Sequence, residues 1–178
     1  IGNPNTGKST LFNALTGLRQ KTANYPGVTV ERHTGHIKLD GHNVTLVDLP
    51  GAYSIAAQSP DEMVAIDVLL GHVEDLPRPR AILAVVDATN LRRNLFLVTQ
   101  LAELGLPMVI GLNMTDLAAA KGIEVDITAL GAGLGAQVVA LSAARGTGLD
   151  ELRSALATAI DAPSPPPLRV LPTVNEAA

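Results

Sequence analysis

The pattern Gly-x-x-x-x-Gly-Lys-Ser at residues 2–9 constrains this chain more than any other stretch. Its glycines let a run of backbone N–H groups curl around a polyanion, and a helix directly behind the loop adds its positive end. An ordinary helix start after small residues is the alternative, but it does not require four fixed positions. We therefore expect a phosphate-binding loop, formed by Gly2, Asn3, Pro4, Asn5, Thr6, Gly7, Lys8, Ser9 and Thr10.

Two side chains of this loop have specific expected roles. Lys8 would reach the β- and γ-phosphates as a point charge, and the Ser9 hydroxyl would bind the Mg²⁺ that bridges them. A phosphate-binding loop normally follows a buried strand, whereas only Ile1 precedes this one. We therefore expect the first strand of the fold to be truncated.

Composition narrows the class of protein. The 178 residues suffice for one domain with a core, and the 47% hydrophobic content favours a well-buried α/β protein. The net charge of −4 and the scattered basic residues argue against nucleic acid as a partner. With no cysteine, disulfides and thiolate metal sites are excluded. We see no secretory signal and no apolar run near the ~18 residues that a membrane helix needs.

Strand and helix patterns alternate along most of the chain. Helices are predicted over 9–16, 59–70, 90–104, 123–135 and 147–160, and strands over 34–39, 43–47, 81–86, 107–112 and 137–141. The first two strands flank Asp40-Gly41, a strong hairpin signal. The segment 19–31 has neither the helical nor the strand periodicity of apolar residues and is interpreted as a mobile loop.

This alternation predicts an α/β fold in which helices cover both faces of a mostly parallel sheet, with one antiparallel edge strand from the hairpin. The domain is expected to span residues 1–161. Residues 162–178 contain Pro-Ser-Pro-Pro-Pro and are expected to form a linker or the start of a truncated helical domain.

Three further short motifs follow predicted strands, where ligands bind in open α/β sheets. They are Asp48-Leu49-Pro50-Gly51, Asn113-Met114-Thr115-Asp116 and Ser142-Ala143-Ala144. Together with the phosphate-binding loop, and in this order, they resemble the translation-factor-related and Ras-like GTPases. The resemblance implies the Ras-like fold and a slow GTPase that binds GTP or GDP.

Guanine recognition follows from hydrogen-bond complementarity. The Asp116 carboxylate would accept from guanine N1–H and its exocyclic amine, which adenine cannot offer. Asn113 would hold the base edge and its loop, the Ala143 N–H would donate to guanine O6, and the stem of Met114 would cover the base. The alternative for Asn113 and Asp116 is a helix N-cap after a strand.

The γ-phosphate end of the site needs groups from mobile loops. Thr29 would close on Mg²⁺ through its hydroxyl, Asp48 would act through a metal-bound water, and the Gly51 N–H would contact the γ-phosphate. Thr22 is the rival to Thr29.

A closer resemblance rests on longer stretches. Residues 2–17, the run Asn-Tyr-Pro-Gly-Val-Thr-Val-Glu at 24–31, the run Asp-Leu-Pro-Gly-x-Tyr-Ser at 48–54 and Asn-Met-x-Asp at 113–116 resemble the N-terminal G domain of ferrous iron transport protein B. This family implies a bacterial inner-membrane Fe²⁺ transporter. Its cytoplasmic GTPase domain is joined through a GDP-stabilising helical domain to a membrane channel of the same polypeptide. The resemblance allows an oligomer and does not specify its state.

The resemblance also bears on hydrolysis. Ala52 stands where a water-orienting glutamine often follows the glycine. Asn5 occupies the family's potassium-binding position, which implies a K⁺ ion near the phosphates, while a turn residue is the equal alternative. No iron ligands are assigned, because His33, His36, His42 and His72 are scattered and expected to be exposed. Competing interpretations are a soluble potassium-activated GTPase acting on ribosome or tRNA, and a nucleotide-sensing switch with little turnover.

Overall fold

The computed structural model describes residues 1–17, 20–26, 28–56 and 59–166. The first half contains α1 (Lys8–Thr16), β1 (Gln20–Asn24), β2 (Glu31–Leu39), β3 (His42–Asp48) and α2 (Pro60–Leu70). The second half contains β4 (Ile82–Asp87), η1 (Ala88–Asn90), α3 (Leu91–Ala102), β5 (Met108–Asn113), α4 (Thr115–Ala120), α5 (Ile127–Leu134), β6 (Gln137–Ala140) and α6 (Leu149–Asp161). The predicted α/β fold is confirmed.

The strands form an antiparallel group and a parallel group. β1, β2 and β3 pair antiparallel, whereas β4, β5 and β6 pair parallel in that order. The predicted hairpin is confirmed: Asp40 and Gly41 both have positive φ, 45° and 88°, as a two-residue hairpin turn requires. Parallel pairing needs the helical crossovers that α3 and α5 provide.

The interpretation of 19–31 as a mobile loop was wrong for Gln20–Asn24, which is strand β1. Each of its residues pairs with a residue of β2, from Gln20 with Gly35 to Asn24 with Glu31. Its sequence Gln-Lys-Thr-Ala-Asn lacks an apolar alternation because the side chains of Lys21 to Asn24 are exposed. The antiparallel part is therefore larger than the hairpin alone. Arg19 and Gly27 lie outside the described residues.

Caps and glycines set most helix ends where the sequence predicts them. The Ser59 hydroxyl accepts from the Glu62 N–H at the start of α2, and Gly71 ends that helix with φ of 78°. The helix predicted over 123–135 begins later, at Ile127, because the Asp126 carboxylate caps it by accepting from the Ala129 N–H. The short α4 was not predicted.

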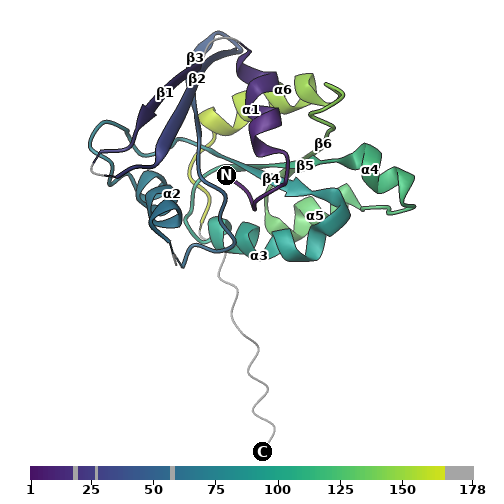
Figure 1. The fold of residues 1–178 in the computed structure, drawn as a ribbon. Coiled ribbons are helices and arrows are strands. Elements are labelled where there is room, and N and C mark those ends of the chain that lie inside the picture. The colour runs from purple at the N-terminus through teal and green to yellow at the C-terminus, as the bar shows by residue number, and fades with distance from the viewer. Residues whose placement is uncertain (18–19, 27, 57–58, 167–178) are drawn as a thin grey trace, which may run out of the picture.

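Two apolar cores lie on opposite faces of the strands (Figure 1). One lies between the sheet and α1 and α6; the other lies between the sheet and α2, α3 and α5. Within the described ranges, no helix is long and apolar enough to cross a bilayer. α6 ends at Asp161. The division of the chain into a domain at 1–161 and a linker or truncated helical domain at 162–178 stays a prediction.

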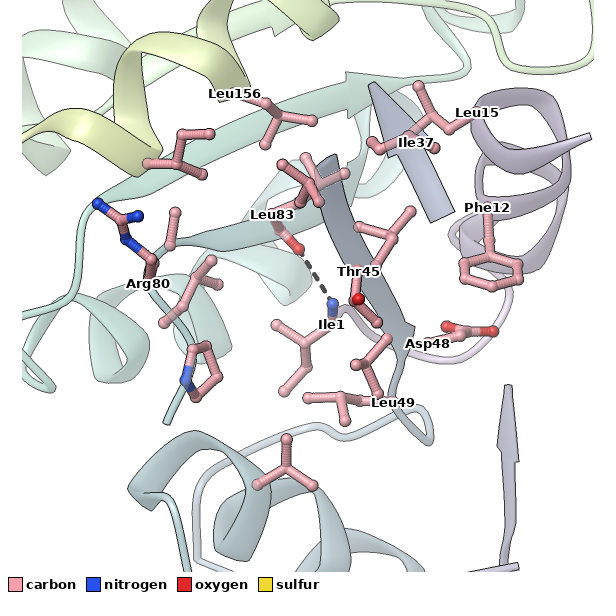
Figure 2. Close-up of a pocket in the computed structure, with 18 of the residues that line it drawn as sticks. Ile1, Phe12, Leu15, Ile37, Thr45, Asp48, Leu49, Arg80, Leu83 and Leu156 are labelled. Atoms are coloured by element: carbon pink, nitrogen blue, oxygen red, sulfur yellow. Dashed lines mark hydrogen bonds between the residues drawn. The ribbon is translucent and has the colours of Figure 1, made fainter. Parts of the chain in front are cut away.

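A slot separates the two strand groups, and Ile1 lies in it (Figure 2). The Ile1 nitrogen donates to Leu83 O at 3.0 Å, Val85 N donates to Ile1 O at 2.8 Å, and Gly2 forms a parallel bridge with Val85. Ile1 and Gly2 thus continue the pairing of β4 on its outer edge. Beyond them extends a cavity of about 590 Å³ between β3 and β4, lined largely by apolar side chains.

Candidate nucleotide-binding site

The loop at 2–9 forms a cradle in front of α1. Gly7 has φ of 80° and is the N-cap of α1, so the first N–H groups of that helix face outward into the cradle. The Thr6 hydroxyl donates to Asn3 O at 2.9 Å and closes the turn. A cavity of about 280 Å³ lies here, lined by Asn3, Pro4, Asn5, Gly7, Lys8, Ser9, Thr10 and Gly51.

Asn113 ties the cradle to the end of β6. It is buried, its Nδ2 donates to Thr6 O at 2.9 Å, and its Oδ1 accepts from the Ala143 N–H at 2.9 Å. Gly7 makes this possible, because a Cβ there would lie 2.3 Å from Asn113 Nδ2. The Asn113 side chain thus connects the loop at Thr6, 107 residues earlier, with the loop at Ala143, 30 residues later.

In the structure the Ala143 N–H donates to the Asn113 side chain. Its expected donation to guanine O6 stays a prediction. Asn113 is a buried amide whose oxygen needs a donor, and Ala143 is the donor that the fold brings to it.

The N-cap alternative for Asn113 and Asp116 is wrong. Met114, with φ of 62°, is the N-cap of α4, while Asp116 lies inside its first turn. Met114 also lies beside the cradle, since its terminal methyl is 3.5 Å from the Cβ position at Gly7.

Lys8, Ser9 and Asp48 meet at the mouth of the cradle. Lys8 Nζ lies 3.1 Å from Asp48 Oδ1, and the Ser9 hydroxyl donates to Asp48 Oδ2 at 3.5 Å. The two ion-pair side chains are only 16% and 10% exposed. A hydroxyl and a carboxylate at the end of β3 form an oxygen donor set of the kind that Mg²⁺ takes, so these residues fit the metal predicted from sequence.

The segment after Asp48 lies against the cradle. A Cβ on Gly51 would come within 3.1 Å of the Pro4 ring, and the Ala52 N–H donates to Gly2 O at 3.2 Å. Gly51 therefore borders the cavity in front of α1, and its contact with a γ-phosphate stays a prediction. Ala52 is buried, with 2% of its surface exposed.

The predicted base-reading carboxylate lies between α4 and the loop after β6. Asp116 Oδ2 lies 2.9 Å from Arg145 Nε. Burial acts to raise the pKa of Asp116, but the Ser142 hydroxyl, the Arg145 charge and the Leu117 N–H outweigh it, so this pKa lies below its usual range. Asp116 is therefore an ionised acceptor at neutral pH.

A buried polar atom in the cradle points to a bound polar group. Asn3 is buried, with 3% of its surface exposed, and within the described residues its Nδ2 has no hydrogen-bond partner. Such atoms are rare because they cost free energy. A phosphate cradle with outward N–H groups is the kind of site in which a ligand satisfies them.

The match to a family model decides the relationship of this chain. Residues 1–156 match the model of ferrous iron transport protein B. The chain belongs to the ferrous iron transport protein B family.

Individual members of the family agree with this assignment. The Fe(2+) transporter FeoB of Escherichia coli K12 is 50% identical over 134 residues, which cover 73% of this chain and 17% of that protein. An S. thermophilus NFeoB mutant bound to GDP has 46% identity and a TM-score of 0.82, and the match covers 89% of this chain and 59% of that one. The cytosolic domain of the T. maritima FeoB in GMPPNP form has 36% identity and a TM-score of 0.84 over 92% and 63%.

Two predicted residues of this family member lie away from the phosphate cavity. Thr29 is exposed in the connection between β1 and β2 and is not among the residues that line the cavity. Its rival Thr22 lies in β1, where its hydroxyl is 3.2 Å from His33 Nδ1. Thr22 is thus engaged in the sheet, which leaves Thr29 as the better candidate.

The histidines form no common site. His33 and His36 face opposite sides of β2, and His42 and His72 lie near Asp161 and Asp67. Across the described ranges, no cluster of three or more His, Cys, Asp or Glu side chains could hold a metal ion.

Sequence reasoning missed Arg145. Nothing in its local pattern indicates that its side chain reaches Asp116, which is 29 positions earlier. Its place directly after Ser142-Ala143-Ala144 was the one available signal.

Proposed function

We propose that this chain is the G domain of a ferrous iron transporter, which binds guanine nucleotides and hydrolyses GTP. The observation that carries the proposal is the contact of Asn113 with both Thr6 O and the Ala143 N–H. It brings the phosphate cradle, the base-reading motif and the loop after β6 to one edge of the parallel strands. That edge is where open α/β sheets bind ligands.

The relatives support the nucleotide and the transport role. The S. thermophilus protein was crystallised with GDP and the T. maritima cytosolic domain with GMPPNP. The E. coli relative is an Fe(2+) transporter, and this chain spans 17% of its length. Transport across the bacterial inner membrane, a channel domain in the same polypeptide and a position on its cytoplasmic side are accordingly proposals for the whole protein.

Different groups of the cradle would bind different phosphates and the metal ion. Backbone N–H groups of residues 5–10 and the start of α1 would bind the β-phosphate, and Lys8 would leave Asp48 to reach the outer phosphates. The Gly51 N–H would turn to the γ-phosphate. Ser9 and Thr29 would hold Mg²⁺ directly and Asp48 through water, and the ion would neutralise charge on the phosphate oxygens.

Replacing Thr29 with alanine should test the metal-dependent step. We expect GTP turnover to fall about 100-fold, because a transition-state contact is lost, while GDP affinity stays nearly unchanged. Phosphate release in a Mg²⁺ buffer and GDP titration measure the two quantities. Thr22→Ala is the matched control, since its hydroxyl contacts His33, and equal turnover in the two variants would contradict the role of Thr29.

Ala52 stands where a glutamine would orient the attacking water, so we expect slow GTP turnover and a need for another positive charge at the phosphates. We propose that a K⁺ ion held by Asn5 compensates charge that develops between the β- and γ-phosphates. Asn5 has φ of 65° and is exposed in the cradle wall, so its turn conformation presents it beside the phosphate cavity.

GTP hydrolysis should accordingly be about tenfold faster in KCl than in NaCl at equal ionic strength. This rate gain is much smaller than the one that an arginine finger gives. Asn5→Ala should abolish this difference and retain GDP binding. Asn5→Asp is a useful second variant because it keeps an oxygen ligand and tolerates the same φ. Equal rates in the two salts would return Asn5 to the role of a turn residue.

A further inference from the structure

We infer that Arg145 competes with guanine for the Asp116 carboxylate and thereby sets how tightly the nucleotide is held. The inference rests on the proposed function, because it needs Asp116 to read the base. Its observation is independent of that function: Arg145 Nε lies 2.9 Å from Asp116 Oδ2, one of the two oxygens of the carboxylate that would read the base.

The loop after β6 holds Arg145 in reach of Asp116. Ser142 and Thr147 form a two-way bridge, with N···O distances of 3.1 and 3.2 Å. The Arg145 N–H donates to Ser142 O at 3.1 Å, which closes a turn inside that bridge. These bonds fix the backbone of Arg145, while its long side chain can still change its hydrogen-bond partner.

The Asp116 carboxylate has few acceptor positions to spare. An ionised carboxylate accepts about four hydrogen bonds. The Ser142 hydroxyl, the Leu117 N–H and the N–H of Asp116 itself already interact with this carboxylate, and Arg145 adds a charged donor. Guanine brings two more donors, so it has to compete with the present partners for these positions.

Arg145 is the partner that can leave at least cost. Ser142 is buried and the two N–H groups belong to the backbone, whereas the side chain of Arg145 is 69% exposed. Its guanidinium presents planar N–H donors on one carbon, as the amine edge of guanine does. The two groups therefore suit the same oxygens, and water can accept the guanidinium when guanine displaces it.

The sign of the effect separates this role from its alternatives. If Arg145 supported Asp116, or only attracted the anionic nucleotide, then removing its charge would weaken binding. Only competition makes binding tighter when the arginine is lost. Because an exposed ion pair contributes little, we expect a change of about two- to fivefold in affinity.

The test measures GDP and ADP affinities of the wild-type chain, Arg145→Ala, and Arg92→Ala as a control with an exposed arginine on α3. We expect Arg145→Ala to bind GDP about two- to fivefold more tightly through slower release, with ADP affinity unchanged because adenine has no donors for Asp116. Arg145→Lys should lie between, since an ammonium can still reach the carboxylate.

Unchanged or weaker GDP binding in Arg145→Ala would overturn the inference. An equal gain for ADP would do the same, because the effect would then arise at the phosphates. If the wild-type chain itself binds ADP as tightly as GDP, then the proposed function fails first, and that outcome is separate from the comparison of the variants.

Discussion

Replacing Asp116 with asparagine is expected to weaken GDP binding by at least about 100-fold and to give the site affinity for xanthosine diphosphate. Two hydrogen bonds to a charged acceptor are lost, each worth about 1.5–3 kcal/mol. The new amide can donate to the 2-oxo group of xanthine, where the carboxylate could only accept. Titration with fluorescent GDP and xanthosine diphosphate measures both effects.

Asp126→Asn is the matched control for this change. It removes the same charge, but Asp126 only caps α5, and asparagine caps a helix equally well. Its GDP affinity and its free energy of unfolding should stay at the wild-type values. If Asp116→Asn keeps its preference for GDP over xanthosine diphosphate, then Asp116 does not read the base.

Replacing Gly7 with alanine should have the second large effect, on both binding and folding. The new methyl would lie 2.3 Å from Asn113 Nδ2, so Asn113 has to move and lose its bonds to Thr6 and Ala143. A buried amide left without partners costs about 1–3 kcal/mol. We expect GDP affinity to fall by at least about 100-fold, because the cradle and the loop after β6 separate.

Gly122→Ala isolates the steric part of this prediction. Gly122 has a positive φ of 68° like Gly7, but a Cβ there would have nothing within 4 Å. It therefore carries only the backbone cost, roughly 1–2 kcal/mol. Urea unfolding and GDP titration of both variants give the comparison, and identical losses in the two would show that the contact with Asn113 is unimportant.

The phosphate-binding loop and its helix could be predicted because their signals are local. Gly7 and Ser9 sit at fixed spacings, and Asp40-Gly41 specifies a hairpin by the conformation that these two residues tolerate. The capping residues Ser59 and Asp126 act within one turn of their helices. The sequence therefore predicted most element ends within a few residues.

What could not be predicted depends on partners far away in the chain. Gln20–Asn24 is polar and becomes a strand only because β2 offers its edge. The bond from the Ala143 N–H to the Asn113 side chain joins residues that are 30 positions apart, and no local pattern indicates it. Arg145 likewise acquires a role only when α4 and the loop after β6 come together. Nonlocal packing overrides local preference in each case.

The most direct test of the central claim is the preference of the wild-type chain for guanine. Fluorescent GDP and ADP are titrated into the same protein in Mg²⁺ buffer, and unlabelled nucleotides are used to displace them. The account predicts that ADP binds weaker by roughly 10⁴-fold, because adenine offers no N–H donors to the ionised Asp116 carboxylate. Comparable affinities for GDP and ADP would contradict it.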